Sequence, residues 1–134
     1  MKLHPFYSKK ILNLFKKPKH AGIIKNYSGI GRVGNPNCGD VLWLYIKVSQ
    51  NKKGEDFIKD AKYHTLGCVA AIAFSEELCK QIKGKTLKQA KKLTNKKLIK
   101  SLGKVPKIKY HCSLLAEQAL KKAIKNYEKK CQKK

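Results

Sequence analysis

The sequence predicts an α+β fold: a small antiparallel three-stranded sheet packed against several helices in a single domain. One observation is a strictly alternating apolar pattern over residues 41–48, followed by a polar turn and a second strand-like segment. Another is that five further segments carry helical signals, which are apolar residues at helical spacing or capping residues. With 134 residues, 42% of them hydrophobic, the chain can bury one core without disulfide or metal staples.

The N-terminal third is expected to hold one helix and one edge strand. Residues 1–6 read as a loose end, and residues 7–17 carry the apolar side chains Ile11, Leu12, Leu14 and Phe15 at helical spacing. Pro18 ends this helix, because proline cannot continue it. Residues 19–34 contain four glycines and predict a loop with a short edge strand near residues 30–33.

The alternation over residues 41–48 predicts a strand with one face on the core, formed by Leu42, Leu44, Ile46 and Val48. Residues 49–55 form the turn of a hairpin, with Gly54 as its flexible position. The return strand is expected over residues 56–65, with Phe57, Ala61 and Tyr63 in register. The start of the first strand and the end of the second therefore lie at the same edge of the sheet.

The rest of the chain is expected to be mainly helical. A helix over residues 68–83 ends at Gly84, and Thr86 and Gln89 have the form of a capping box that opens a short helix to about residue 93. A further helix begins at Thr94 and ends at Gly103. Residues 105–109 are expected to be extended, because a proline disfavours helix in the residue before it. The last helix, residues 112 to about 130, has the core-facing stripe Ala116, Leu120, Ala123, Ile124 and Tyr127.

The net charge of +24 raises the question of nucleic-acid binding. Nearly all of the basic residues are lysine, and Arg32 is the only arginine, whereas nucleic-acid surfaces depend on arginine for bidentate and stacking contacts. The lysines are also spread along the whole chain. We therefore interpret them as a solvated surface that binds polyanions non-specifically at low salt.

The chain has no run of 18 apolar residues and no signal-like segment, so a soluble, cytoplasmic protein is expected. In that setting five cysteines are better read as ligands or free thiols than as disulfides.

Three of the cysteines occupy special backbone positions. Cys38 lies in a loop, residues 34–40, between two glycines and two residues before Asp40. Cys68 and Cys112 each stand at the start of a predicted helix, and His111 precedes Cys112. A helix N-terminus favours the thiolate, which is the form that binds metal.

The hairpin brings Cys38 and Cys68 to the same sheet edge, although they are 30 residues apart. No Cys-x-x-Cys pair is present, so spacing alone supports a metal site only weakly. Cys79 lies about 16 Å along the helix from Cys68, and Cys131 lies in the lysine-rich tail, so both are expected to be bystanders. His4, His20 and His64 read as exposed or strand-face residues.

Three segments, Gly34–Asp40, Gly67–Ala73 and His111–Ala119, closely resemble in this order the IscU/NifU-type iron–sulfur cluster assembly scaffolds. The similarity runs from Tyr7 to Tyr127 and implies a single domain over residues 1–134, with loose ends at about 1–6 and 128–134.

The resemblance implies that Cys38, Cys68 and Cys112 hold a transient 2Fe–2S cluster, and that Asp40 and His111 complete or exchange the fourth coordination position. Sulfur would arrive as persulfide from a cysteine desulfurase, with Cys112 as the acceptor. Electrons would come from a ferredoxin, and Fe²⁺ with the help of a frataxin-like protein. The cluster would pass to apo iron–sulfur proteins with Hsp70 and J-protein chaperones, and Zn²⁺ would bind in the same site. Such a scaffold is not an enzyme.

One departure from the family pattern lies in the chaperone-recognition stretch, which usually reads Leu-Pro-Pro-Val-Lys. Here it is the partner-binding candidate Val105, Pro106, Lys107, Ile108 and Lys109, so that the second proline is replaced by lysine.

Three alternatives remain open from the sequence. One is a zinc-bound persulfide acceptor that uses the same residues, and another is a basic nucleic-acid-binding protein. A cysteine hydrolase built on Cys112 and His111 is the poorest, because no third group is in evidence to orient the histidine.

Overall fold

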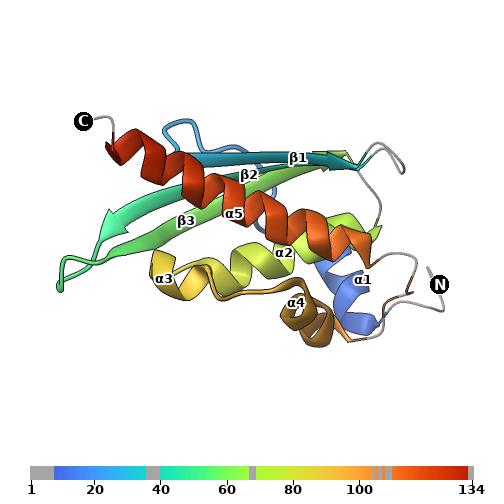
Figure 1. The fold of residues 1–134 in the computed structure, drawn as a ribbon. Coiled ribbons are helices and arrows are strands. Elements are labelled where there is room, and N and C mark those ends of the chain that lie inside the picture. Colours follow the sequence, from blue (N-terminus) through green and yellow to red (C-terminus); the bar gives the residue numbers. More distant parts are fainter. Residues whose placement is uncertain are drawn as a thin grey trace.

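The computed structural model describes residues 8–35, 40–66, 69–103, 105, 107 and 110–132. The described residues form a three-stranded antiparallel sheet in the order β1 (Gly29–Asn35), β2 (Asp40–Gln50) and β3 (Asp56–Leu66). The helices of this part of the chain are α1 (Lys9–Lys16), α2 (Val69–Ile82), α3 (Leu87–Ala90), α4 (Asn95–Leu102) and α5 (His111–Gln132). Figure 1 shows α5 and α2 lying along one face of the sheet. The predicted α+β class is confirmed.

The alternation in β2 sets the two faces of the sheet. Leu42, Leu44 and Ile46 are buried beneath α2 and α5, as predicted, and Val48 is partly buried at the end of the same row. On the opposite face, the Trp43 ring stacks on the His64 ring at 4.2 Å, and the Arg32 guanidinium lies 5.6 Å from the Trp43 ring centre. These three residues are direct cross-strand neighbours, one from each strand.

The predicted register of the return strand is wrong at its beginning. The β2–β3 ladder shifts between Lys47 and Val48, so that Val48 pairs with Ile58 and Lys47 pairs with Asp60. A bulge of one residue reverses the side-chain alternation on one strand. Ala61 and Tyr63 are buried as predicted, whereas the buried residue before the bulge is Ile58, and Phe57 is only partly buried.

Helix ends follow the predicted capping residues. The Thr86 hydroxyl accepts from the Gln89 amide, and the Gln89 side chain accepts from the Thr86 amide, which completes the capping box. Thr94 caps α4, and Gly84 and Gly103 adopt positive φ after α2 and α4. Some bounds differ from the prediction by a few residues: α1 begins at Lys9 with Ser8 as its cap and ends at Lys16, α2 ends at Ile82, and α3 ends at Ala90 instead of about residue 93.

Helix α5 lies unusually close to β1. A Cβ atom at Gly31 would stand 2.0 Å from the Ala119 carbonyl oxygen, and one at Gly29 would stand 2.3 Å from the Ala123 carbonyl oxygen. Only glycine permits this backbone approach. From the same helix, the Asn126 side chain accepts from the Ile30 amide, and Lys122 donates to the Arg32 carbonyl, so that two outward groups of β1 are paired.

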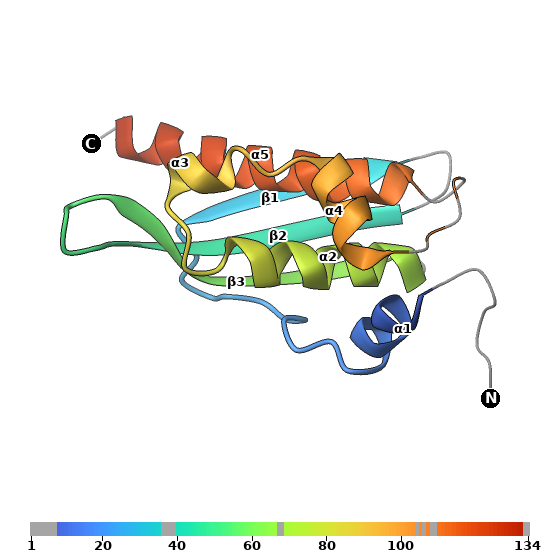
Figure 2. The same cartoon turned by 90° about the horizontal axis from the view of Figure 1, so that it is seen from below.

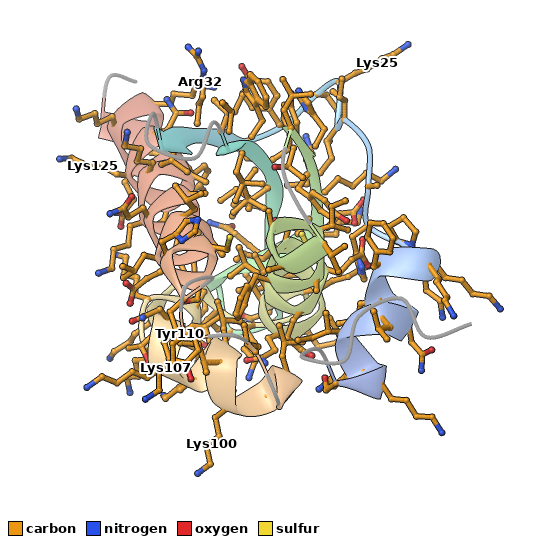
Figure 3. The ribbon with its side chains drawn as sticks, turned by 90° about the vertical axis from the view of Figure 1, so that its right-hand side faces the viewer. Lys25, Arg32, Lys100, Lys107, Tyr110 and Lys125 are labelled. Atoms are coloured by element: carbon orange, nitrogen blue, oxygen red, sulfur yellow. The ribbon has the colours of Figure 1, made fainter. Side chains whose placement is uncertain are left out.

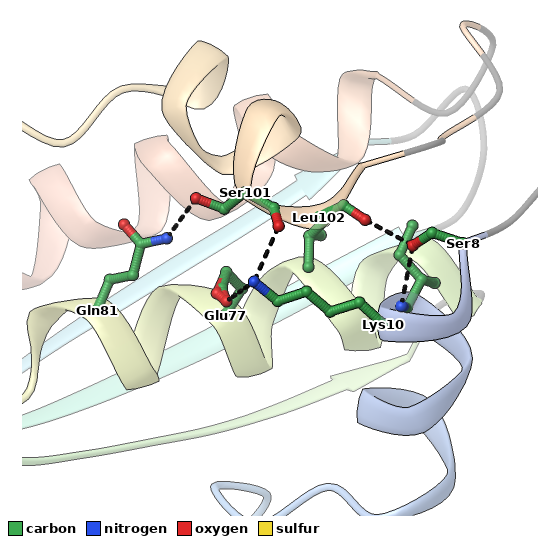
Figure 4. A network of polar contacts seen from close by, with 7 residues as sticks. Ser8, Lys10, Glu77, Gln81, Ser101 and Leu102 are labelled. Atoms are coloured by element: carbon green, nitrogen blue, oxygen red, sulfur yellow. Dashed lines mark hydrogen bonds and ion pairs between the residues drawn. The ribbon is translucent and has the colours of Figure 1, made fainter.

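The N-terminal segment is fastened to the helices by polar contacts (Figure 4). Ser8 donates to the Leu102 carbonyl at the end of α4. Lys10 donates to the Ser101 carbonyl at 2.8 Å and forms a 3.1 Å ion pair with Glu77 of α2, a carboxylate that is only 2% exposed. Figure 2 shows α1 beside α2, away from α5. Further along the segment, Gly22 and Tyr63 hydrogen-bond across the outer edge of β3.

The last helix begins one residue earlier than predicted, at His111, and continues to Gln132. Its predicted stripe is buried from Ala116 to Ile124, and Tyr127 packs against the edge of the core. Greater mobility at the two chain ends stays a prediction. None of the helices in the described part of the chain is long and apolar enough to cross a lipid bilayer.

Candidate metal centre

The described residues that flank the predicted ligands in the sequence converge on one end of the fold. At this end β1 finishes at Asn35, which pairs with Asp40 at the start of β2, and β3 finishes at Leu66, which pairs with Val41. Helices α2 and α5 both begin here (Figure 1). Figure 3 looks onto this end, with Lys107 and Tyr110 on the side of α4 and α5. The topology thus brings together positions that lie far apart in the sequence.

Cys112 and His111 are the predicted ligands whose side chains the structure describes at this end. Cys112 is 2% exposed, and its Sγ atom lies 3.5 Å from Nε2 of His111. A tetrahedral zinc ion holds sulfur at about 2.3 Å and nitrogen at about 2.1 Å, which separates two such donors by roughly 3.6 Å. The pair therefore has the spacing of two ligands of one metal ion. Both residues belong to the first turn of α5, and the dipole at the N-terminal end of a helix stabilises negative charge.

The other predicted ligands lie at the limits of the described structure. Cys38 and Cys68 fall in residues 36–39 and 67–68, outside the described residues, and the Asp40 backbone is described but its side chain is not. Within the described ranges, no group of three or more His, Cys, Asp or Glu side chains is placed to hold a metal ion. The three-cysteine ligand set therefore stays a prediction, and Cys112 and His111 are the two of the five predicted ligands whose side chains are described.

The two thiols that were predicted to be bystanders lie away from this end. Cys79 is fully buried in the core, and its burial, followed by the negative charges of Glu76 and Asp60, raises its pKa well above the ordinary value of 9.0. A thiol kept protonated in this way is a poor metal ligand. Cys131 is exposed near the far end of α5, about 29 Å along the helix from Cys112.

Large apolar side chains are exposed around the same end. Leu66 is 66% exposed, Leu114 is 43% exposed and Tyr110 is 37% exposed. In the partner-binding candidate 105–109, Val105 is buried in the core and Lys107 is exposed. Lys107 lies in a tight turn, in which its carbonyl accepts a hydrogen bond from the Tyr110 amide. The predicted extended conformation is therefore wrong at this residue. Pro106, Ile108 and Lys109 lie outside the described residues.

The sequence interpretation missed a second polar cluster, on α2. Glu76 and Glu77 are each only 2% exposed. Glu76 accepts from the His20 backbone amide at 2.8 Å, and its other oxygen lies 3.0 Å from Nδ1 of His20. His20 is therefore a half-buried partner of a carboxylate and not an exposed residue, whereas His64 does lie on the strand face. The signal was present: two adjacent glutamates within an apolar helix need partners once they are buried.

Sequence comparison places this site in a known context. Residues 6–134 match the family model of the NifU-like N-terminal domain. The iron–sulfur cluster assembly scaffold protein IscU 1 of Archaeoglobus fulgidus is 44% identical over 124 residues, which cover 92% of this chain and 78% of that protein. The scaffold protein IscU of Rickettsia prowazekii is 42% identical over 127 residues, covering 92% and 93% of the two chains.

Among solved structures, a scaffold protein for the SUF system from Fervidobacterium islandicum has a similar fold. The TM-score is 0.71 at 23% identity, and the match covers 92% of this chain and 99% of the other. At that identity the likeness concerns the fold alone. The family model matches nearly the whole chain, and the relatives are more than 40% identical. The protein therefore belongs to the IscU/NifU-type family, and it corresponds to the NifU-like N-terminal domain of that family.

Proposed function

We propose that this protein is a scaffold on which a labile 2Fe–2S cluster is assembled and from which it passes to apo-proteins. The observation that carries the proposal is the 3.5 Å separation of the Cys112 sulfur and the His111 ring nitrogen, at the end of the fold where β1, β2 and β3 place Asn35, Asp40 and Leu66, the described residues nearest in sequence to Cys38 and Cys68. The scaffold relatives support this reading over the nucleic-acid-binding alternative.

The predicted ligands suit a cluster that is bound only transiently and is then transferred. Three thiolates from Cys38, Cys68 and Cys112 match the soft-ligand chemistry of iron–sulfur clusters. His111 or Asp40 in the fourth position would make the site asymmetric, whereas a stable electron-transfer centre uses four cysteines. The protein's own residues would bind and orient the cluster, and the reaction catalysed at the site belongs to its partners.

The proposed partners follow from what assembly consumes. A cysteine desulfurase would supply persulfide sulfur to Cys112, and apo iron–sulfur proteins would receive the cluster. A ferredoxin and a frataxin-like protein would supply electrons and Fe²⁺. Hsp70 and J-protein chaperones would recognise residues 105–109, where the exposed Lys107 replaces the family's second proline. The exposed Leu66, Tyr110 and Leu114 offer apolar contact area beside the site.

A zinc-bound persulfide acceptor is the second candidate, since the same thiolate and imidazole donors suit Zn²⁺. Anaerobic incubation with Fe²⁺, cysteine and a cysteine desulfurase separates the two candidates. Visible absorption and Mössbauer spectra should reveal about one 2Fe–2S cluster per site, and the cluster should transfer to an apo-ferredoxin. Persulfide formation on Cys112 with zinc retained and no cluster would instead favour the zinc-bound persulfide acceptor.

Cysteine variants test the ligand assignment in the same assay. We expect Cys38→Ser, Cys68→Ser and Cys112→Ser each to lose stable cluster assembly, because each removes one thiolate. The matched controls are Cys131→Ser and Cys79→Ala, whose thiols are exposed far from the site and buried in the core. A normal cluster yield from Cys68→Ser, or a loss in Cys131→Ser, would contradict the assignment.

A further inference from the structure

A groove of about 690 Å³ lies between α1, α2 and the turn after α1, outside the proposed cluster site. Its walls carry Leu14 of α1, Lys17 directly after that helix, Lys19 of the turn and Lys80 of α2. This volume is in the range that binds a drug-sized molecule or a few residues of a peptide.

The floor of the groove is rigid and polar. Glu76, 2% exposed, reaches it from α2 and is held by His20 through the backbone amide and the ring. The N-terminal side of α1 is held in place by the ion pair between Lys10 and Glu77 and by the Lys10 contact to α4 (Figure 4). Both walls are therefore fixed to α2, and the groove is part of the folded structure.

The charge of the groove is not balanced from within the described protein. The ion pairs among the described residues engage Lys10, His20, Lys83 and Lys91, so that Lys17, Lys19 and Lys80 form none. The chain has only 8 acidic residues against 32 lysines and arginines. Three exposed ammonium groups thus surround an apolar patch at Leu14.

We propose that this groove is a docking site for an acidic segment of a partner protein, with an apolar side chain seated on Leu14 and carboxylates facing the three lysines. Charge complementarity selects this occupant. A second copy of this chain carries +24 and would be repelled, and residues 1–7 contain no acidic residue. The proposal does not depend on the cluster chemistry.

The distance between the groove and the cysteine end indicates what a partner bound in the groove would do. Glu76 and Lys80 lie about 10 Å and 16 Å along α2 from its first residue, Val69, which stands at the cysteine end. A partner held in the groove would leave that end accessible to a second protein. The groove would thus tether one partner while another works at the cysteines.

The test uses a fluorescein-labelled synthetic peptide of about twelve residues, mostly glutamate with two leucines, and fluorescence anisotropy in 150 mM KCl. The triple variant Lys17→Ser, Lys19→Ser and Lys80→Ser should bind at least tenfold more weakly than the wild type. The control triple Lys52→Ser, Lys53→Ser and Lys59→Ser removes the same charge from exposed sites at the hairpin end and should bind within twofold of wild type. Equal weakening in both triples would overturn the proposal.

Two further arms separate the groove from general attraction. Leu14→Ala keeps the charge and should weaken binding of the leucine peptide, but not of an all-glutamate peptide. Inorganic pyrophosphate or ATP that displaces the peptide through the same lysines at lower concentration would identify a small-anion site and overturn the proposal. Circular dichroism and cluster assembly of each variant show that the fold and the cluster site are intact, so that a failure here is distinct from a failure of the scaffold function.

Discussion

At the scale of single residues, the geometry of Cys112 and His111 is the most informative feature. Neighbours in an α-helix normally point about 100° apart, yet here the sulfur and the ring nitrogen lie 3.5 Å from each other. His111 is the first residue of α5 and Cys112 is buried behind it. His111 is partly exposed, whereas Cys112 is buried. Of the two donors, the imidazole is therefore the more accessible to solvent and to an exchanging ligand.

A substitution at Asp40 tests whether this residue acts in release of the cluster and not in its assembly. Asp40 begins β2 opposite Asn35, and it follows Cys38 by two residues in the sequence. A carboxylate next to three thiolates can compete for iron and open a route for exchange, so Asp40→Ala should still assemble a cluster, which should persist longer and transfer more slowly to an apo-ferredoxin. The measurements are cluster lifetime and transfer rate.

The competing role for Asp40 is to cap the turn. In that case the alanine variant would lose about 1 kcal/mol of stability and hold its cluster less durably. Thermal unfolding of the same variant provides the control, and a shorter-lived cluster would exclude the release role.

The buried thiol of Cys79 makes a prediction about alkaline stability. Burial raises its pKa in the folded state, so unfolding above about pH 9 releases a proton, and this contribution to stability is present below pH 9 and lost as the pH rises. Wild-type stability should fall by up to about 1.4 kcal/mol per pH unit from this group between pH 9 and 10. The free energy of unfolding in urea, compared with that of Cys79→Ala, isolates the effect. Parallel pH curves for the two proteins would contradict it.

At the scale of elements, the periodicity of apolar residues predicted the helices and strands, but it did not predict the β-bulge or contacts between residues far apart in the sequence. The buried stripe of α5, the capping box at Thr86 and the core row of β2 follow directly from residue spacing. The bulge near Lys59 does not, because one extra residue carries no compositional signal, and it moved the buried position from Phe57 to Ile58. His20 was misjudged for a similar reason: its partner Glu76 is 56 residues away.

The contact of α5 with β1 depends on two glycines. Gly31→Ala would place a Cβ atom 2.0 Å from the Ala119 carbonyl oxygen and 2.8 Å from the Ala123 amide nitrogen. Because both are backbone atoms of a long helix, the clash cannot be relieved by a side-chain rotation. We expect a loss of about 3 kcal/mol in the free energy of unfolding.

Urea denaturation checks this value. Gly54→Ala is the matched control, since nothing lies within 4 Å of its added Cβ and only the positive φ of +80° opposes it. It should cost about 1 kcal/mol. If Gly31→Ala proves no more harmful than Gly54→Ala, the close approach of α5 is not needed for stability.

At the scale of the whole molecule, the lysine-rich surface governs encounters with polyanions. The amino groups of Lys25, Lys100 and Lys125 point outward in different directions around the fold (Figure 3). With +24 net charge, the protein should bind RNA at low ionic strength with a steep salt dependence. Because the charges are dispersed and nearly all lysine, binding should be independent of sequence and almost vanish at 150 mM salt. Filter binding or anisotropy with two unrelated RNA sequences measures both, and a sequence-selective complex at 150 mM salt would contradict this prediction.

The topology of the sheet could be predicted well enough to place the candidate site. A hairpin returns its second strand to the end from which the first began, which predicts one common end for Cys38 and Cys68. The pairing of Val41 with Leu66 gives the described residues this arrangement. The helix start at Cys112 could be predicted, but not that α5 would bring it to the same end, since that depends on the packing of α5 against β1 at Gly29 and Gly31. Before the structure, only the family resemblance indicated that Cys112 lies at the same end as the other two cysteines.

The pairing of the outer β1 groups by α5 has a consequence for self-association. An open strand edge invites a strand from another molecule, which is how folded proteins enter fibrils. Here the Ile30 amide and the Arg32 carbonyl are already engaged by Asn126 and Lys122, and the ammonium of Lys122 would repel a second copy of so basic a chain. Strand addition at this edge would first require α5 to peel away from the sheet, so the fold resists templated aggregation even at high concentration.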